Sequence, residues 1–140
     1  MDPVTAVGLA ASAIQLIDAT TTTLRCLNEI KNAPKERARL AMEITSLLSV
    51  LTSLRYRVEE CKPNGSWFAA VRFLGVKNGP LDQLASTIND LQIKLGAGDG
   101  LLKIKHALFW PLTKNDVQDL FVRVERIKSL ISLAFQEDLS

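Results

Sequence analysis

The sequence predicts an all-α protein, a helical bundle of four long helices and two short connecting ones. Apolar residues recur in alternating steps of four and three, which places one apolar stripe along each helix of a bundle. The clearest series are Leu40, Ile44, Leu47, Leu51, Leu54, Val58 and Cys61, then Leu81, Leu84, Ile88, Leu91 and Leu95, and finally Val117, Leu120, Val124, Ile127, Ile131 and Ala134. Proline and glycine stand between these series, where helices start and end. No stretch alternates apolar and polar residues convincingly, so no strand is expected.

The chain of 140 residues has the usual size of one domain, so we expect a single domain over 1–140. Hydrophobic residues make up 47% of it and charged residues 23%, which is typical of a compact globule. A formal net charge of +2 is too small to predict nucleic-acid binding. Cys26 and Cys61 lie far apart, without a CxxC motif or a neighbouring histidine. We expect them to be buried thiols in a reducing cytosol.

The first helix is expected over 4–32 and is apolar on all sides. Its expected seam is Val7, Ala10, Ile14, Ile17, Thr21 and Leu24, and its other faces carry Val4, Leu9, Ala11, Ala13 and Leu16. A helix that is apolar all round either lies at the centre of a bundle or enters lipid.

Length and polarity give opposing indications about lipid. The 22 residues from Pro3 to Leu24 would extend about 33 Å as a helix, close to the roughly 30 Å hydrocarbon core of a bilayer. Asp18 opposes a transmembrane span, because an isolated carboxylate there costs about 2.5–3.5 kcal/mol. Asp2 stands where a secretory signal has basic residues. Composition alone therefore leaves a core role and a membrane role open.

The second long helix is expected over 34–61. Pro34 suits its first turn, where the missing N–H costs nothing. Arg39 and Glu43 have the i,i+4 spacing of a modest ion pair on the solvated face. After "KPNGS", Ser66 can cap a short helix in "WFAAVRFLG".

The third long helix is expected over 80–96, headed by a proline and ended by "GAGDG", because glycine tolerates left-handed backbone. A second short helix is expected in "KIKHALFW", which Pro111 should stop or kink. The last long helix is expected over 114–137. Thr113 is placed as its N-cap, with Asp116 near the positive end of the helix dipole.

The sequence carries no motif for enzyme, metal or cofactor chemistry. His106 is the single histidine and has no evident serine or cysteine partner. "GAGDG" follows a helix rather than a strand and lacks the Gly-Lys-Ser/Thr of a phosphate loop. The adjacent carboxylates at 59–60 and 137–138 lack metal-ligand spacing. We therefore expect no enzyme activity, no cofactor and no metal.

Two clusters combine aromatic and basic residues, in "SWFAAVRFLGVK" and "KIKHALFW". Such pairs are favourable at a bilayer interface, where rings are half wet and cations meet anionic head groups. The candidate interfacial residues are Trp67, Phe68, Arg72, Lys103, Lys105 and Trp110. The alternative is that these rings cap the ends of the bundle core. Nucleic-acid binding through them is not expected, given the near-balanced charge.

Five blocks of the chain, in order, resemble the HeLo-like N-terminal domain of fungal NOD-like receptors, which are STAND proteins. Similar domains head amyloid-controlled cell-death effectors. The blocks are "MDPVTAVGLAASAIQLID", "KNAPKERARLAMEITSLLSVLTSLRYRVEE", "WFAAVRFLGVKNGPLDQL", "ALFWPLTKNDVQDL" and "VERIKSLISLAFQED". They are structural and interfacial signatures, and none is a catalytic motif.

The resemblance implies a helical bundle without enzyme activity that induces programmed cell death. A nucleotide-binding or amyloid-motif region of the same longer chain would cluster such domains into oligomers. The N-terminal segment, 1–24, would then leave the bundle and insert into the plasma membrane, where the basic residues of the two clusters would favour anionic lipids. Its inserting residues would be Val4, Val7, Leu9, Ile14, Leu16, Ile17 and Leu24. The domain would be cytoplasmic when inactive and at the plasma membrane when active. The alternative is a non-lytic helical adaptor of such a receptor.

Overall fold

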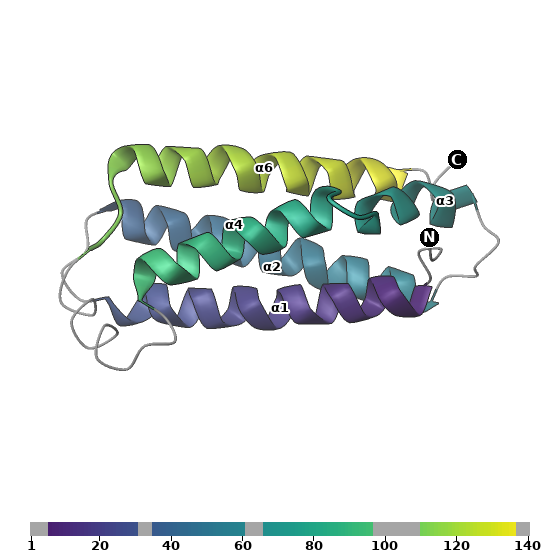
Figure 1. Cartoon of the computed structure of the whole chain (residues 1–140), viewed down its shortest axis with the longest axis horizontal. Coiled ribbons are helices and arrows are strands. Elements are labelled where there is room, and N and C mark those ends of the chain that lie inside the picture. The colour runs from purple at the N-terminus through teal and green to yellow at the C-terminus, as the bar shows by residue number, and fades with distance from the viewer. Residues whose placement is uncertain (1–5, 31–34, 61–65, 97–109, 137–140) are drawn as a thin grey trace.

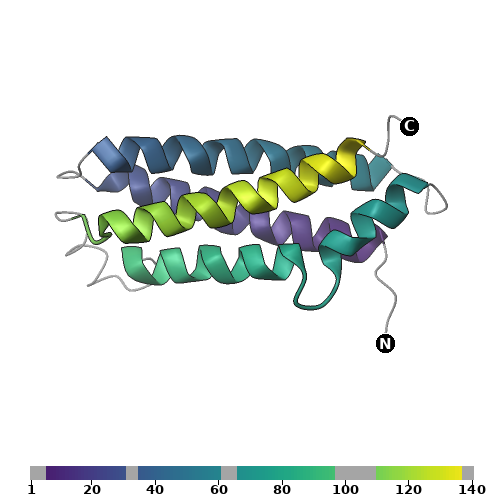
Figure 2. The same ribbon diagram turned by 90° about the horizontal axis from the view of Figure 1, so that it is seen from above.

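The computed structural model describes residues 6–30, 35–60, 66–96 and 110–136. Four long helices run side by side along the molecule (Figures 1 and 2). They are α1 (Ala6–Glu29), α2 (Lys35–Glu60), α4 (Pro80–Leu95) and α6 (Lys114–Gln136). The short helix α3 (Ser66–Arg72) continues into the 3-10 turn η1 (Phe73–Gly75) before α4. No strand occurs among the described residues, so the predicted all-α bundle is confirmed. The short helix predicted in "KIKHALFW" falls almost wholly outside them.

The helices form a ring in which each long helix has two main neighbours. α1 packs against α2 and α4, and α6 packs against the same two helices. α3 lies on α6, while η1 contacts both α4 and α1. The first turns of α1, the last turns of α6 and α3 therefore lie at the same end of the bundle (Figures 1 and 2). At this end, the start of α1 lies near the first aromatic–basic cluster, residues 66–77.

Proline and glycine mark the two ends of α4, as the sequence predicts. Pro80 occupies its first turn, and Gly96 adopts a left-handed φ of 75° while its N–H donates to the carbonyls of Gln92 and Ile93. Gly79 precedes the helix in a tight turn, where its N–H donates to the carbonyl of Val76 at 2.8 Å. A Cβ on Gly79 would lie 2.7 Å from Val76 Cγ2, so a larger residue there would force the turn to shift.

The seams predicted for three of the long helices form the core. All of their described members are buried, from Leu40 to Val58 on α2, Leu81 to Leu95 on α4 and Val117 to Ala134 on α6. Cys61 lies outside the described residues, and Cys26 is half-buried against the core rather than fully buried.

The seam predicted for the first helix is wrong. The buried residues of α1 are Leu9, Ala13, Leu16, Thr20, Thr23 and Leu27, and Val7 is 81% exposed. These six positions follow the same alternating steps of four and three. A seam counted from apolar residues alone misses them, because two of its members are threonines and the neighbouring faces are equally apolar. Thr23 tolerates burial because its Oγ1 donates to the carbonyl of Ala19 at 2.8 Å.

Candidate functional site

The first part of α1 has no charged residue from Ala6 to Ile17, yet it is only partly covered by the bundle. The exposed residues there are Val7, Gly8, Ala11 and Gln15, of which only Gln15 has a polar side chain. Most exposed positions of the other long helices are polar or charged. The start of α1 therefore presents apolar side chains and backbone to solvent, an arrangement that favours an apolar partner or an apolar phase.

The residues predicted to insert into lipid fall into three groups in the structure. Leu9 and Leu16 are buried at 1% and 4% exposure. Ile14, Ile17 and Leu24 are half-buried, and Val7 is exposed. Val4 lies outside the described residues. Only part of the set can contact lipid while α1 stays in the bundle.

The residues predicted to lie at a membrane interface are also divided. Phe68 and Trp110 are half-buried and pack against the core, as the capping alternative predicts. Arg72 is exposed at the end of α3, and Phe73, the next residue, is 55% exposed. Lys103, Lys105 and the side chain of Trp67 lie outside the described part of the chain. Helix α3, which ends at Arg72, lies at the same end of the bundle as the first turns of α1 (Figure 1).

A groove of about 270 Å³, lined by both polar and apolar side chains, lies between part of α1 and α4. Its lining includes Ser12, Gln15 and Ala19 of α1 with Asp82, Asn89 and Gln92 of α4. Gln92 Nε2 donates to the carbonyl of Ala19 at 3.0 Å, the same oxygen that accepts the Thr23 hydroxyl. This hydrogen bond fixes α1 to α4 without a charge.

The threonine run at residues 20–23 places hydroxyl groups in the otherwise apolar buried seam of α1. Thr20 is fully buried, and its Oγ1 has no hydrogen-bond partner among the described residues. A buried unsatisfied hydroxyl costs about 1–3 kcal/mol. Thr21, by contrast, donates to the carbonyl of Ile17 at 2.8 Å. The seam that holds α1 is therefore less favourable than one built only of aliphatic residues.

The contact between α2 and α6 is built around Lys128. Its Nζ lies 2.9 Å from Glu43 Oε1, 2.9 Å from Glu125 Oε1 and 3.0 Å from Ser46 Oγ. The side chains of Lys128 and Glu43 are only 14% and 12% exposed. Burial alone would lower the pKa of Lys128, but the hydrogen bonds to Glu43 and Glu125 outweigh it and raise the pKa. The hydrogen bond from Lys128 in turn lowers the pKa of Glu125.

Cation–π contacts lie on both sides of this ion pair. The guanidinium of Arg39 lies 4.6 Å from the ring centroid of Phe121, and that of Arg57 lies 4.3 Å from the ring of Phe135. The predicted pair between Arg39 and Glu43 is therefore wrong, because each finds its partner on α6 instead. An exposed i,i+4 pair is worth only about 0.3–0.5 kcal/mol, so a partner from another helix easily displaces it. Sequence spacing along one helix could not reveal these partners.

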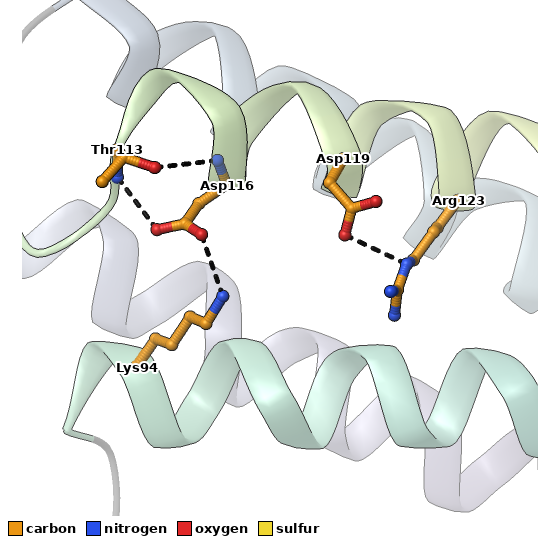
Figure 3. A network of polar contacts seen from close by, with 5 residues as sticks. All are labelled: Lys94, Thr113, Asp116, Asp119 and Arg123. Carbon is orange, nitrogen blue, oxygen red and sulfur yellow. Dashed lines mark hydrogen bonds and ion pairs between the residues drawn. The ribbon is translucent and has the colours of Figure 1, made fainter.

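The start of α6 has the predicted cap (Figure 3). The N–H of Asp116 donates to Thr113 Oγ1 at 3.0 Å, and the N–H of Thr113 donates to Asp116 Oδ2 at 3.0 Å. Lys94 of α4 adds an ion pair to Asp116 Oδ1 at 3.0 Å. The backbone hydrogen bond from Thr113 and the contact with Lys94 lower the pKa of Asp116. This cap fixes where α6 begins and links it to the end of α4.

Comparison with known proteins adds no relative: no family model, curated protein or solved structure matches the chain. None of the helices described combines the length and hydropathy that a transmembrane span requires. Within the described ranges, no three histidine, cysteine or acidic side chains are grouped to hold a metal ion. The resemblance to HeLo-like domains stays a prediction.

Proposed function

We propose that the chain is a membrane-targeting, pore-forming-type cell-death effector domain activated by oligomerisation. In this proposal residues 1–24 leave the bundle and insert into the plasma membrane, favouring anionic lipids, while the resting domain is cytoplasmic. A nucleotide-binding or amyloid-motif region of the same chain would supply the clustering. The observation that carries the proposal is the uncharged, partly exposed start of α1, at the same end of the bundle as α3, which ends in the exposed Arg72.

Release of α1 requires an exchange of environments. Leu9 and Leu16 would lose burial worth about 1.5–3 kcal/mol each. Lipid and neighbouring copies of α1 would restore apolar contacts, and the Gln92 hydrogen bond would be lost. The unpaired hydroxyl of Thr20 reduces the free energy by which packing in the bundle stabilises α1. Clustering raises the effective concentration of α1 segments, which makes the exchange favourable only in an oligomer.

Length sets how deep the helix would reach. The 12 residues from Ala6 to Ile17 extend about 18 Å, short of the roughly 30 Å hydrocarbon core. The uncharged part would therefore enter from one side, with Asp18 kept near the head groups or facing other copies. Insertion of this depth does not require a helix that spans the bilayer alone.

A matched pair of valines tests the proposal without disturbing the core. Val7 on α1 and Val122 on α6 are 81% and 58% exposed, so a glutamate at either position should leave the bundle folded. The protein, joined to an inducible oligomerisation domain, is added to dye-filled vesicles of phosphatidylcholine and phosphatidylserine. Val7→Glu should lower the rate of dye release at least about tenfold, because a carboxylate in hydrocarbon costs about 2.5–3.5 kcal/mol. Val122→Glu should leave the rate unchanged.

Equal leakage from both variants would contradict insertion of α1. Circular dichroism confirms that each variant is folded. Leu16→Glu is a poor test, because Leu16 is 4% exposed and its loss would unfold the bundle.

A second candidate, a non-lytic adaptor module, is favoured by a different surface. The outer face of α2 has no charge from Met42 to Tyr56, at positions 42, 45, 49, 52 and 56. Met42 and Tyr56 are 74% and 66% exposed. An uncharged helix face with exposed large side chains suits packing against another helical domain. Absence of leakage at every degree of clustering, together with self-association that Met42→Asp abolishes in light scattering, would favour this function.

A further inference from the structure

A groove of about 280 Å³ lies between α4 and α6. It is lined by Gln83, Ser86 and Thr87 of α4 and by Arg123, Arg126 and Ile127 of α6. Thr87 and Ile127 are 5% and 3% exposed and form its floor. Two guanidinium groups from α6 thus line the same groove as hydroxyl and amide groups from α4.

The two arginines keep donors available. Arg126 is exposed and has no ion pair or hydrogen bond among the described residues. Arg123 uses Nε to contact Asp119 Oδ2 at 3.1 Å, with side chains 53% and 59% exposed. Its side chain extends from α6 toward α4 (Figure 3). The Nη atoms of Arg123 are further donors besides the Nε that contacts Asp119.

Charge is distributed unevenly along this helix pair. At one end of the α4–α6 contact, Lys94 is neutralised by Asp116. Asp90 and Asp119 follow by helical spacing toward the middle. At the groove itself, the α4 side offers only uncharged Gln83, Ser86 and Thr87. The residues that line the groove together with Arg126 therefore include no carboxylate.

We propose that this groove binds a phosphate-class anion, held by Arg123 and Arg126 with the Ser86 hydroxyl as a further donor. Arginine is the cation best suited to such a ligand, because its planar fork matches two oxygens of a phosphate. Ser86 is exposed, and its hydroxyl has no hydrogen-bond partner among the described residues. The groove is near the lower limit of roughly 300 Å³ for ligand pockets, which suits one phosphate group with a small substituent. No residue of α1 lines it, so binding does not depend on the release of α1.

The chain offers a matched control for the test. Arg55 and Glu59 on α2 form an exposed i,i+4 pair at 3.0 Å with the same atom type, Nε, as Arg123 and Asp119. Inorganic phosphate is titrated into the wild-type chain at constant ionic strength, and binding is followed by amide chemical shifts in NMR spectra. The largest shifts are expected at Ser86, Thr87, Arg123 and Arg126.

Arg126→Gln and Arg123→Gln should each weaken phosphate binding about tenfold or more, the loss expected for a charge-assisted hydrogen bond. Asp119→Asn should tighten it up to about fivefold, because the competing carboxylate is removed. Arg55→Gln should leave the affinity unchanged. Loss of affinity that is equal in Arg55→Gln and Arg126→Gln, or no effect of either groove arginine, would overturn the proposal.

Vesicles identify the source of the anion. Flotation is measured with phosphatidylcholine vesicles containing phosphatidic acid, or phosphatidylserine at the same surface charge. Binding to phosphatidic acid vesicles that Arg126→Gln abolishes and Val7→Glu preserves assigns the groove to a lipid head group. Binding of inorganic phosphate without that vesicle preference assigns it to a free anion. Val7→Glu acts on the proposed insertion and not on the groove, so the two proposals fail separately.

Discussion

α1 and α6 occupy equivalent places in the ring, each packed against α2 and α4, but they are attached by different chemistry. α6 is held by a nearly buried ion pair between Lys128 and Glu43 and by two cation–π contacts with α2. α1 is held by an uncharged seam that includes two buried threonines, and by a side-chain amide from α4. The charges that attach α6 would be costly in lipid, whereas the seam of α1 could be exchanged for another apolar environment.

The difference indicates which helix can leave. If α6 left α2 for lipid, Lys128 would lose Glu43 and enter an apolar phase as a charged group, which is strongly unfavourable. Departure of α1 would uncover mainly apolar surface, a cost that further copies or lipid can offset. The comparison therefore supports α1, and not α6, as the mobile element of the proposed function.

The largest expected effect comes from the ion pair that holds α6. Glu43→Gln should lower the free energy of unfolding by about 1–3 kcal/mol, because an exposed pair is worth about 0–1 kcal/mol and breaking a buried one costs about 3–5 kcal/mol. Glu59→Gln removes the carboxylate of the exposed pair with Arg55 and should change stability by less than about 0.5 kcal/mol. Urea unfolding followed by circular dichroism measures both. Equal losses would mean that Glu43 and Lys128 do not secure α6.

A smaller effect, of opposite sign, is expected at the seam of α1. Thr20→Val replaces a buried unpaired hydroxyl with a methyl group of similar size and should raise the free energy of unfolding by about 1 kcal/mol. Thr23→Val is the control, because the Thr23 hydroxyl already donates to Ala19, and it should give no gain. Under the proposed function, Thr20→Val should also slow dye release. A loss of stability in Thr20→Val would show that its hydroxyl has a partner in solution and that the seam is not weakened there.

The sequence predicted the seams of α2, α4 and α6 because their seam positions are almost all apolar while charged or polar residues mark the outer faces. Their 3.5-residue period is therefore visible without a structure. The same rule failed on α1, where Ala10, Ile14 and Ile17 lie beside the true seam and are as apolar as its members. The rotation of such a helix is decided by its neighbours, which the sequence does not display.

Sequence reasoning missed the polar contacts and the groove that residues of two different helices form together. Lys128 and Glu43 are 85 residues apart, and Ser86 and Arg126 become neighbours only because α4 and α6 pack together. Local rules instead paired Arg39 with Glu43 on one helix. The cap of α6 was predictable because Thr113 and Asp116 are three residues apart, within reach of local geometry. Polar contacts between residues far apart in the sequence can be predicted only once the packing of the helices is known.

The smallest expected effect concerns pH and the link between α4 and α6. The backbone N–H of Thr113 and the cation of Lys94 lower the pKa of Asp116 from its ordinary 3.8. The pKa of Asp116 is lower in the folded state than in the unfolded state. The stabilisation is therefore present in full above the unfolded pKa, and it is lost as pH falls through the folded pKa. Asp116→Asn should therefore flatten the acid limb of stability below about pH 4, measured by thermal unfolding between pH 2 and 7. Asp119→Asn, which removes an exposed carboxylate one turn further along α6, should leave that limb as in the wild type. An acid limb unchanged by Asp116→Asn would mean that the cap contributes nothing as an anion and that packing alone joins the two helices.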